Sequence, residues 1–433
     1  MSTFKNGSKH TQNSIVVIGG GPAGIMAAIA AAKNIPRKEV AVMLLEKNQE
    51  LGKKLKITGG SRCNITNAGQ PRDILENIVT NKKFATKSIY TFSSQDLMQM
   101  LEANGCPLKA ERNNEIYPRS DDSTQVVETL LHILNAHYVK LYFRTEVEEL
   151  FVNNSKITGI RLKNGQTYGA AKVVLATGGI SYPVTGSTGK GFELAKKLGH
   201  SVTPLKPSLA PLVIKEKWIT ELAGIAFNDI IIKTKIEKTP GKLITKKFDG
   251  DLLITHFGIS GPAPLHLSTL LKDIYIPAEG HRISIDFVPE LSHKWLQGEF
   301  ISKSTHKKQI STILADFWPK RFVSKILAHL DVKESTRMNQ LSKKERNTII
   351  NSLKDLKLTV LKVKNTNEAM VTSGGINTNE ISPSTLESKF IQGLHFAGEI
   401  LDVDALSGGF NLQLAFSTGF LAGKSSACSL ELY

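Results

Sequence analysis

The sequence predicts an α/β fold in which a parallel sheet with flanking helices is interrupted by a β-rich and a small helical insertion. A β-branched run at 14–18 leads through a glycine-rich turn into an Ala-rich helical segment that reaches residue 32. A second apolar run follows at 40–45, which completes the strand–helix–strand order of a parallel sheet. Residues 205–364 change to strand-like runs and then, at 291–353, to amphipathic helical patterns, before glycine-rich motifs resume.

The composition is that of an ordinary globular protein. Of the 433 residues, 41% are hydrophobic and 22% are charged, which excludes a disordered or fibrous chain. The length predicts two or three domains. Three scattered cysteines, Cys63, Cys106 and Cys428, argue against a disulfide framework and against a Cys-rich zinc site. We therefore expect no metal and a reducing, cytoplasmic setting.

The N-terminus imitates a targeting segment. Basic residues within 1–13 precede an uncharged stretch at 14–32, which is the pattern of a signal peptide or a membrane helix. The three glycines and the proline at 19–22 instead suit a turn between a strand and a helix. We expect residues 1–13 to form a disordered tail. For the rest we expect no membrane segment and a monomer or weak dimer.

The turn after the first strand has the spacing of a dinucleotide-binding loop in a Rossmann-type domain. The first glycine allows the tight turn, the second lets the backbone approach a pyrophosphate, and the third packs helix against strand. The N-terminus of the helix then faces the phosphates. The loop residues assigned to this role are Gly19, Gly21, Pro22, Ala23 and Gly24.

An acidic residue ends the second predicted strand. Glu46 lies about 22 residues beyond Gly24, where a carboxylate can accept hydrogen bonds from a ribose. Glutamate rather than arginine argues against a 2′-phosphate on this nucleotide. We include the neighbouring Lys47 in the predicted site.

Three later segments favour FAD as the bound dinucleotide. Residues 144–150 resemble the flavoprotein segment whose backbone, here at Val147, meets the adenine. Residues 173–179 resemble the ATG motif of two-dinucleotide-binding flavoproteins, and 393–399 resemble the late flavin motif, in which an acid contacts the ribityl chain or the pyrophosphate. The candidate residues of these last two motifs are Ala176, Thr177, Gly178, Gly398, Glu399 and Asp402.

Four segments carry a more specific resemblance. They are residues 51–67, 176–189, 253–263 and 398–413, and they include the strings GGSRCN, THFG and GGFNLQ. Together they resemble the BaiN-like flavoprotein family, also called the aminoacetone oxidase family, of NAD(P)/FAD-dependent oxidoreductases. The family motif usually reads GGGRCN, so Ser61 is a small departure.

The resemblance implies bound FAD and three structural units. A discontinuous FAD-binding domain of the two-dinucleotide-binding type would comprise residues 14–204 and 365–433. An inserted β-barrel-like domain would comprise residues 205–290 and 354–364, with a helical subdomain at 291–353.

The resemblance also implies further cofactor-binding residues. Arg62 would hold the flavin pyrophosphate or a substrate anion. Asn64, Asn411 and Gln413 would hydrogen-bond the isoalloxazine edge, although simple turn and cap roles remain open for them. The other residues of this set are Lys54, Cys63, Gly409, Phe410 and Leu412.

Flavin chemistry needs an electron donor and a source of protons. The sequence has no CxxC or CxxxxC pair, which argues against disulfide-reductase chemistry, and no second complete GxGxxG. NADH or NADPH would therefore visit the flavin transiently. Cys63 and His256 are the candidate catalytic proton donors, with packing and structural roles as the alternatives. Tyr182 is a weaker candidate.

The net charge of +16 points to a polyanionic partner. Residues 205–364 hold 27 of the 55 Lys and Arg but 16 of the 39 Asp and Glu, a net charge of +11. We assign this surface to ribosomal RNA, with a merely solvated lysine-rich surface as the alternative. The residues assigned to a substrate or RNA surface are Lys233, Lys235, Lys246, Lys247 and Tyr182.

The activities assigned within the family differ. They include reduction of a conjugated enone in bile-acid derivatives, oxidation of aminoacetone, and reduction of the uridine C5=C6 bond in large-subunit ribosomal RNA. The charge of the insertion favours the last, so we predict an FAD enzyme that makes dihydrouridine in rRNA. The alternatives are a small-molecule flavin oxidase or enone reductase, and a flavin-holding RNA-binding factor without turnover.

Overall fold

The computed structural model describes residues 14–35, 40–239, 242–305 and 307–430. The predicted tail at 1–13 lies outside the described residues. The chain divides into two compact units, the first formed by residues 1–207 and 370–433 and the second by 208–369. The structure thus confirms an α/β fold with an inserted β-rich and helical part. The finer division into three domains remains a prediction.

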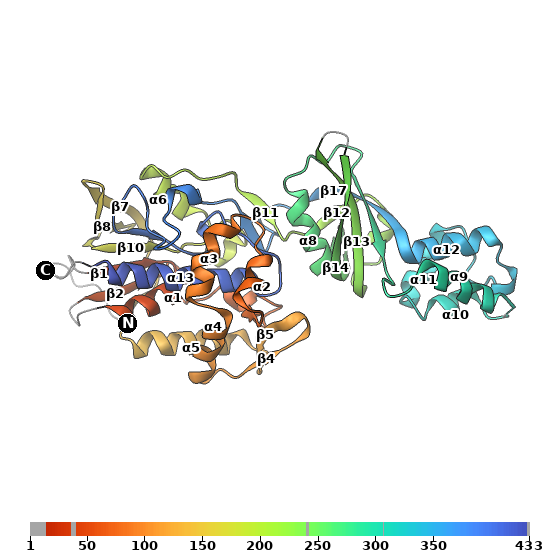
Figure 1. Cartoon of the computed structure of the whole chain (residues 1–433), viewed down its shortest axis with the longest axis horizontal. Coiled ribbons are helices and arrows are strands. Elements are labelled where there is room, and N and C mark those ends of the chain that lie inside the picture. Colours follow the sequence, from red (N-terminus) through yellow and green to blue (C-terminus); the bar gives the residue numbers. More distant parts are fainter. Residues whose placement is uncertain (1–13, 36–39, 240–241, 306, 431–433) are drawn as a thin grey trace. The chain divides into compact units, whose positions relative to one another are not determined.

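A five-stranded parallel sheet forms the centre of the first unit, in the order β19-β10-β1-β2-β6 (Figure 1). Ile18 pairs with Leu45 and with Leu175, and Leu175 pairs with Phe396, so four strands end at one level. The loops that follow them therefore meet at the carboxyl edge of the sheet. The strands are β1 (Ser14–Ile18), β2 (Ala41–Leu45), β6 (Lys140–Tyr142), β10 (Lys172–Leu175) and β19 (Leu394–Phe396).

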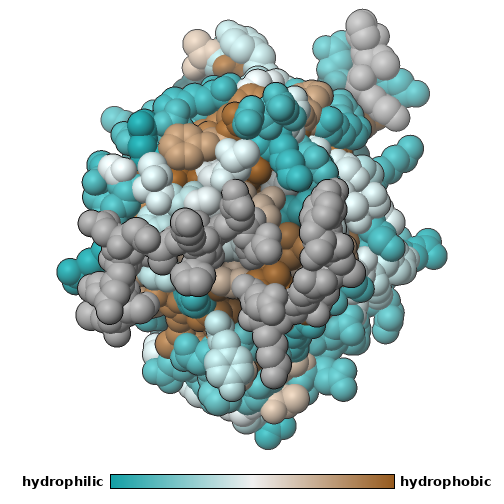
Figure 2. Space-filling view, turned by 90° about the vertical axis from the view of Figure 1, so that its left-hand side faces the viewer, coloured by the Kyte–Doolittle hydropathy of each residue, from teal (hydrophilic) through white to brown (hydrophobic). Residues whose placement is uncertain are grey.

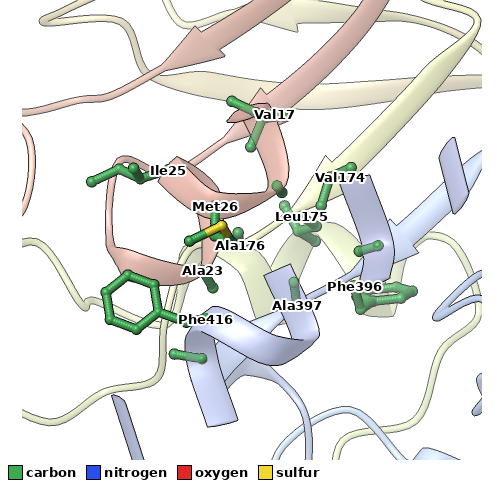
Figure 3. Close-up of a cluster of buried hydrophobic side chains, with 14 of the residues drawn as sticks. Val17, Ala23, Ile25, Met26, Val174, Leu175, Ala176, Phe396, Ala397 and Phe416 are labelled. Carbon is green, nitrogen blue, oxygen red and sulfur yellow. The ribbon is translucent and has the colours of Figure 1, made fainter. Parts of the chain in front are cut away.

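Two helices, α1 (Pro22–Asn34) and α13 (Phe410–Cys428), pack against each other at unusually close range. A Cβ on Gly419 would lie 2.2 Å from the Ala23 carbonyl oxygen, and one on Gly423 would lie 2.0 Å from that of Ala27. Only glycine fits at these two crossings. Figure 3 shows the result, with Ala23 and Phe416 in one apolar cluster with the sheet.

Smaller elements surround this core. A three-stranded antiparallel sheet consists of β7 (Val147–Asn153), β8 (Lys156–Leu162) and β9 (Thr167–Gly169), and a second consists of β3 (Thr66–Asn67), β5 (Glu115–Pro118) and β4 (Leu108–Ala110). A two-stranded sheet pairs β11 (Lys206–Ser208) with β18 (Val371–Ser373). The helices are α2 (Pro71–Glu76), α3 (Lys82–Thr91), α4 (Ser94–Ala103), α5 (Ser123–Ala136) and α6 (Lys190–Lys197), with short 3-10 turns η1 (Leu55–Ile57), η3 (Pro183–Thr185) and η7 (Gly398–Ile400).

The second unit combines a closed six-stranded barrel with a helical part. The barrel order is β12 (Leu212–Ile214), β15 (Gly258–Ser260), β14 (Lys242–Thr255), β13 (Ala226–Thr239), β16 (His281–Asp286) and β17 (Leu356–Val363). Two helices, α7 (Lys217–Thr220) and α8 (Pro262–Leu271), accompany it. The helical part contains α9 (His293–Ser302), α10 (Ile310–Leu314), α11 (Lys320–His329) and α12 (Lys343–Asp355), with 3-10 turns η4 (Lys303–Thr305) and η5 (Met338–Gln340).

The barrel and the helices of the second unit share one core. The ring of Phe287, which follows β16, lies 4.7 Å from that of Phe227 in β13 and 5.6 Å from that of Phe322 in α11. Phe287 also meets the buried Trp318 edge to face at 5.7 Å. These aromatic contacts fix the helical part on the barrel.

The visible face of the molecule in Figure 2 is mostly hydrophilic, with smaller hydrophobic areas between the polar side chains. In the part of the chain that the structure describes, no helix combines the length and the apolar character needed to cross a bilayer.

Candidate functional site

The carboxyl edge of the parallel sheet collects the sequence-predicted nucleotide motifs. The loop at 19–24 follows β1, Glu46 follows β2, residues 176–179 follow β10 and residues 397–399 follow β19. In parallel α/β sheets, ligands bind in the crevice outside the carboxyl ends of the strands. The fold therefore brings four motifs, far apart in the sequence, to one candidate site.

The glycine loop leaves open space at one position only. Gly19 has a φ of +109°, and a Cβ there would lie 2.4 Å from the Ala176 carbonyl oxygen. A Cβ on Gly24 would lie 1.8 Å from the Gly19 carbonyl oxygen, whereas one on Gly21 would meet nothing within 4 Å. Gly21 is also the N-cap of α1, so the open space lies where unpaired backbone N–H groups point. This cradle suits a pyrophosphate.

Glu46 is held in place by backbone donors. The Gly20 N–H donates to its Oε2 at 2.6 Å and the Asn48 N–H donates to its Oε1 at 2.7 Å. The Thr145 N–H donates to the Glu46 carbonyl at 2.9 Å, which brings the segment leading to the buried Val147 alongside. The Lys47 ammonium donates to the Thr188 hydroxyl at 3.0 Å. The predicted ribose and adenine residues thus lie in neighbouring segments.

A polar network surrounds Glu399 at the end of β19. The Lys54 ammonium donates to Glu399 Oε2 at 2.8 Å and to the Ser181 hydroxyl at 2.6 Å. The Ser181 hydroxyl donates to Oε1 at 2.7 Å, and the Thr372 N–H donates to the same oxygen at 2.8 Å. The Thr372 hydroxyl in turn accepts from the Ser181 N–H at 3.1 Å. Three separate segments therefore converge on the Glu399 carboxylate.

Burial alone would raise the pKa of Glu399. The charge of Lys54, its hydrogen bond, and the donors from Ser181 and Thr372 outweigh burial and hold this pKa below its usual value. Glu399 is therefore a carboxylate at neutral pH. Sequence reasoning missed Ser181 and Thr372. Ser181 lies within the family-like segment 176–189 and could have been predicted from it, but nothing in the sequence indicates Thr372.

The ATG motif after β10 contains an unsatisfied hydroxyl. The buried Thr177 Oγ1 has no hydrogen-bond partner among the described residues, and Gly178 beside it has a φ of +73°. An open cradle at Gly21 and an unpaired hydroxyl at Thr177 fit a dinucleotide at this edge. Gly21, Glu46 and Thr177 are the residues that would hold FAD there.

Cys63 lies in a constrained loop and is fully buried. Ser61 has a φ of +70° and Cys63 a φ of +64°, so this loop contains two non-glycine residues in the left-handed region. Asn64 secures the loop when its amide is oriented to satisfy both neighbours: its nitrogen then donates to the Thr66 carbonyl at 3.0 Å and its oxygen accepts from the Gly409 N–H at 3.1 Å. Burial raises the pKa of the Cys63 thiol to about 12. These observations favour a packed thiol over an acid.

Arg62 is engaged by carboxylates of its own chain. It pairs with Glu111 and, at 2.7 Å, with Asp121, and its guanidinium lies 4.3 Å from the centre of the Tyr117 ring. Glu111 and Asp121 hold the pKa of Arg62 above its usual value. Lys109 joins the same two carboxylates. These partners lie 49 and 59 positions away, and no local sequence pattern indicates them.

The residues at the start of α13 make contacts within the chain. Asn411 accepts from the Ala405 N–H at 3.0 Å and donates to the Ala405 carbonyl at 2.8 Å. The fully buried Gln413 accepts from the Thr66 hydroxyl at 2.6 Å and donates to the Phe92 carbonyl at 3.1 Å. These bonds favour the turn and cap roles. The neighbouring Gly409 is the N-cap, Phe410 is buried, and Leu412 is partly buried.

Two other predicted residues lie at turns. The Asp402 N–H donates to the Ile376 carbonyl at 3.1 Å, just after η7. Tyr182 has a φ of +50° and precedes η3 in the first unit. In the second unit, His256 is exposed in the two-residue turn between β14 and β15. Its ring meets Phe257 edge to face at 4.8 Å, and Lys364 lies 4.3 Å from the centre of the Phe257 ring.

The four predicted lysines of the β13–β14 hairpin do not share one face. Lys233 pairs with Lys247 and Thr234 with Lys246 in the strand register. Directly opposite residues share a face and neighbours alternate, so Lys246 lies on the face opposite to Lys233, Lys235 and Lys247.

Lys233 is also committed to the barrel. Its Nζ lies 3.0 Å from the Oδ2 of the buried Asp286, whose Oδ1 lies 2.9 Å from the Nζ of Lys354. The remaining hairpin lysines, Lys235, Lys246 and Lys247, are exposed.

Comparison with known proteins agrees with this geometry. The sequence model of the HI0933-like protein Rossmann domain matches residues 13–425. The 3-dehydro-bile acid delta(4,6)-reductase of Clostridium scindens is 32% identical over 96% of this chain and 99% of its own. The ribosomal RNA dihydrouridine synthase of Escherichia coli is 29% identical over 95% of this chain and 98% of its own.

Solved structures with low sequence identity share the fold. The 3-ketosteroid-delta4-(5alpha)-dehydrogenase from Rhodococcus jostii RHA1 superposes with a TM-score of 0.54 at 14% identity, over 97% of this chain and 98% of that one. A flavocytochrome c3 fumarate reductase gives a TM-score of 0.50 at 17% identity, over 96% of this chain and 79% of that one. The chain therefore belongs to the HI0933-like family, the family of the BaiN-like proteins and aminoacetone oxidases, and is an FAD-dependent oxidoreductase.

Proposed function

We propose that this protein reduces an activated C=C bond, and that its substrate is uridine in large-subunit ribosomal RNA. Two full-length relatives carry names that describe such a reduction, one on a bile-acid enone and one on rRNA uridine. The observation that selects RNA is the net charge of +11 on residues 205–364. A steroid-sized substrate needs no such field, whereas phosphates are recognised through it.

When bound, FAD would supply the hydride, and NADH or NADPH is the proposed source of its electrons. Gly21 leaves room for the pyrophosphate, Glu46 offers a fixed carboxylate for the ribose, and Glu399 remains ionised beside Lys54. Hydride addition to one alkene carbon leaves the other to be protonated. Of the two predicted proton donors, the Cys63 thiol is sealed in the core, which argues against it as the source of this proton, whereas His256 is exposed on the second unit.

Nucleoside mass spectrometry of large-subunit rRNA tests the function. Cells that lack the protein should lose dihydrouridine, and the wild-type chain should restore it. A Gly21→Val variant, which should lose FAD, should not restore it. An unchanged dihydrouridine level without the protein would contradict the proposal.

The second candidate is a small-molecule enone reductase, which the 32% identity to the bile-acid reductase favours. It predicts NAD(P)H oxidation by the purified protein that depends on a conjugated 3-ketosteroid and is indifferent to added rRNA. Loss of dihydrouridine in deficient cells together with no enone turnover would reject this candidate.

A further inference from the structure

The helical part of the second unit carries the densest positive charge of the insertion. Residues 291–353 contain 12 Lys and Arg and five Asp and Glu, a net charge of +7. The barrel segments at 205–290 and 354–364 contain 15 Lys and Arg and 11 Asp and Glu, a net charge of +4. The helical part therefore dominates the field that a polyanion would meet.

One seam of this helical part gathers cations from two segments. Gln309 forms an antiparallel bridge with Arg337, and the Met338 N–H donates to the Lys308 carbonyl at 3.0 Å. Helix α12 begins five residues after Met338, so its first two residues lie within roughly 20 Å of this bridge even at full extension. We call the following residues the basic seam: Lys307, Lys308, Arg337, Lys343 and Lys344.

The cations of the basic seam are available. All five side chains are exposed, and none of them forms an ion pair with any residue that the structure describes. Nearby carboxylates are already engaged. Glu345 accepts from the Ser342 N–H at 2.8 Å and from its hydroxyl at 2.7 Å, and Glu334 accepts from the Ser324 hydroxyl. These carboxylates keep their charge but form no ion pair with the seam, so its five cations are not paired directly with any described residue.

An exposed aromatic residue lies on the same helical part. Trp295 in the first turn of α9 is 48% exposed. His293, the first residue of the same helix, lies with its Nε2 2.9 Å from the Asn351 Oδ1, which sets the start of α9 against α12. Unstacked RNA bases bind exposed aromatic rings as well as cations. The helical part thus carries both an exposed tryptophan and unpaired cations, a combination that suits RNA better than an acidic protein.

We propose that the basic seam is the main surface through which this protein holds the phosphates of its RNA substrate. The β13–β14 hairpin is less suited, because Lys233 is bound to Asp286 and Lys246 lies on the opposite face. The proposal rests on the proposed function in rRNA, and it places the grip on the helical part rather than on the barrel hairpin.

The test compares two variants that remove the same charge. One replaces Lys307, Lys308, Lys343 and Lys344 by serine. The other replaces Lys83, Lys87, Lys196 and Lys197, which are exposed on α3 and α6 of the first unit, by serine. Binding of full-length FAD-loaded protein to large-subunit rRNA from deficient cells is measured over a range of salt concentrations. Flavin absorbance and thermal unfolding confirm that each variant is folded.

The seam variant should bind rRNA at least about tenfold more weakly near 0.15 M salt, and the slope of log K against log salt should fall by about 2 to 3. The control variant should stay within about twofold of wild type. Equal losses of rRNA affinity in both variants, or binding to phosphatidylglycerol vesicles in place of rRNA, would contradict the proposal that the basic seam binds RNA.

The two proposals fail separately. If the seam variant binds rRNA as tightly as the wild type does, and the wild type restores dihydrouridine in deficient cells, the seam is rejected as the RNA-binding surface. The proposed function then still stands. Seam-dependent rRNA binding without any change in dihydrouridine on deletion rejects the function and leaves the seam standing.

Discussion

Lys54 and Glu399 are 345 positions apart in the sequence, yet the Lys54 Nζ lies 2.8 Å from the Glu399 Oε2. The pair joins the segment after β2 to the turn after β19. Because only about a fifth of the Glu399 side chain is exposed, the ionisation of this carboxylate depends on its lysine partner. The pair therefore stabilises the fold at the edge where the nucleotide motifs meet.

Replacing Lys54 by glutamine should raise the pKa of Glu399 and lower the free energy of unfolding by about 1–3 kcal/mol at pH 7. In the wild type the pKa of Glu399 is depressed, so its contribution is present above the unfolded pKa near 4.3 and is lost as the pH falls through the folded value. Urea unfolding at pH 7 and pH 4 should show the difference between variant and wild type shrinking in acid.

Lys56→Gln is the matched control, because Lys56 pairs with Glu50 at the surface at 2.5 Å. Surface pairs contribute about 0–1 kcal/mol, so this variant should unfold close to wild type. An equal cost for both substitutions would show that the Lys54–Glu399 pair has no special role.

Gly21→Val and Gly24→Val should fail in different ways. A Cβ on Gly21 meets open space, so this variant should fold and be purified without FAD, with far-UV circular dichroism like that of the wild-type apoprotein. A Cβ on Gly24 lies 1.8 Å from a backbone oxygen, so that variant should not fold. Flavin absorbance and circular dichroism separate the two. A yellow Gly21→Val protein would contradict a pyrophosphate at this position.

The sequence predicted what depends on local pattern. Gly19 and Gly24 are required for reasons of backbone space alone, so β1, α1 and the carboxyl edge could be predicted from neighbouring residues. The alternation of strand-like runs in 205–290 likewise predicted a β-rich insertion, which the structure shows to be a closed barrel.

What the sequence could not predict depends on contacts between distant segments. Thr372 reaches Glu399 and Ser181 only because β18 and the loop after β10 meet in the fold. The carboxylates that engage Arg62 come from two further loops. Spacing cannot encode such partners. The family-like motif placed Arg62 and Gln413 at the cofactor, while the structure records their contacts within the chain.

Only one of the three cysteines should react with iodoacetamide in the native protein. Cys63 and Cys106 are fully buried and Cys428 is exposed. Burial raises the pKa of both buried thiols, that of Cys63 to about 12, so thiolate is scarce as well as inaccessible. Peptide mass spectrometry at pH 8 should find alkylation at Cys428 alone. Urea should expose the other two, and rapid alkylation of Cys63 without denaturant would restore it as a reactive acid.

His395 in β19 should make the protein acid-sensitive. Its side chain is fully buried, and neither ring nitrogen has a hydrogen-bond partner among the described residues. Burial lowers its pKa to about 4; Glu387 opposes this shift and Lys172 adds to it. A depressed histidine pKa gives stability that is present above the unfolded value near 6.5 and is lost as the pH falls toward 4. The loss should be on the order of 3 kcal/mol.

His395→Leu should remove this loss, because leucine has no proton to gain and no unpaired nitrogen to bury. In urea unfolding at pH 7.5 and pH 5, the variant should lose less stability than wild type between the two values. His132→Gln on the exposed face of α5 is the control and should keep the wild-type pH dependence. If His395→Leu keeps the same acid sensitivity, the titrating group lies elsewhere, and the loss of stability in acid cannot be assigned to this imidazole.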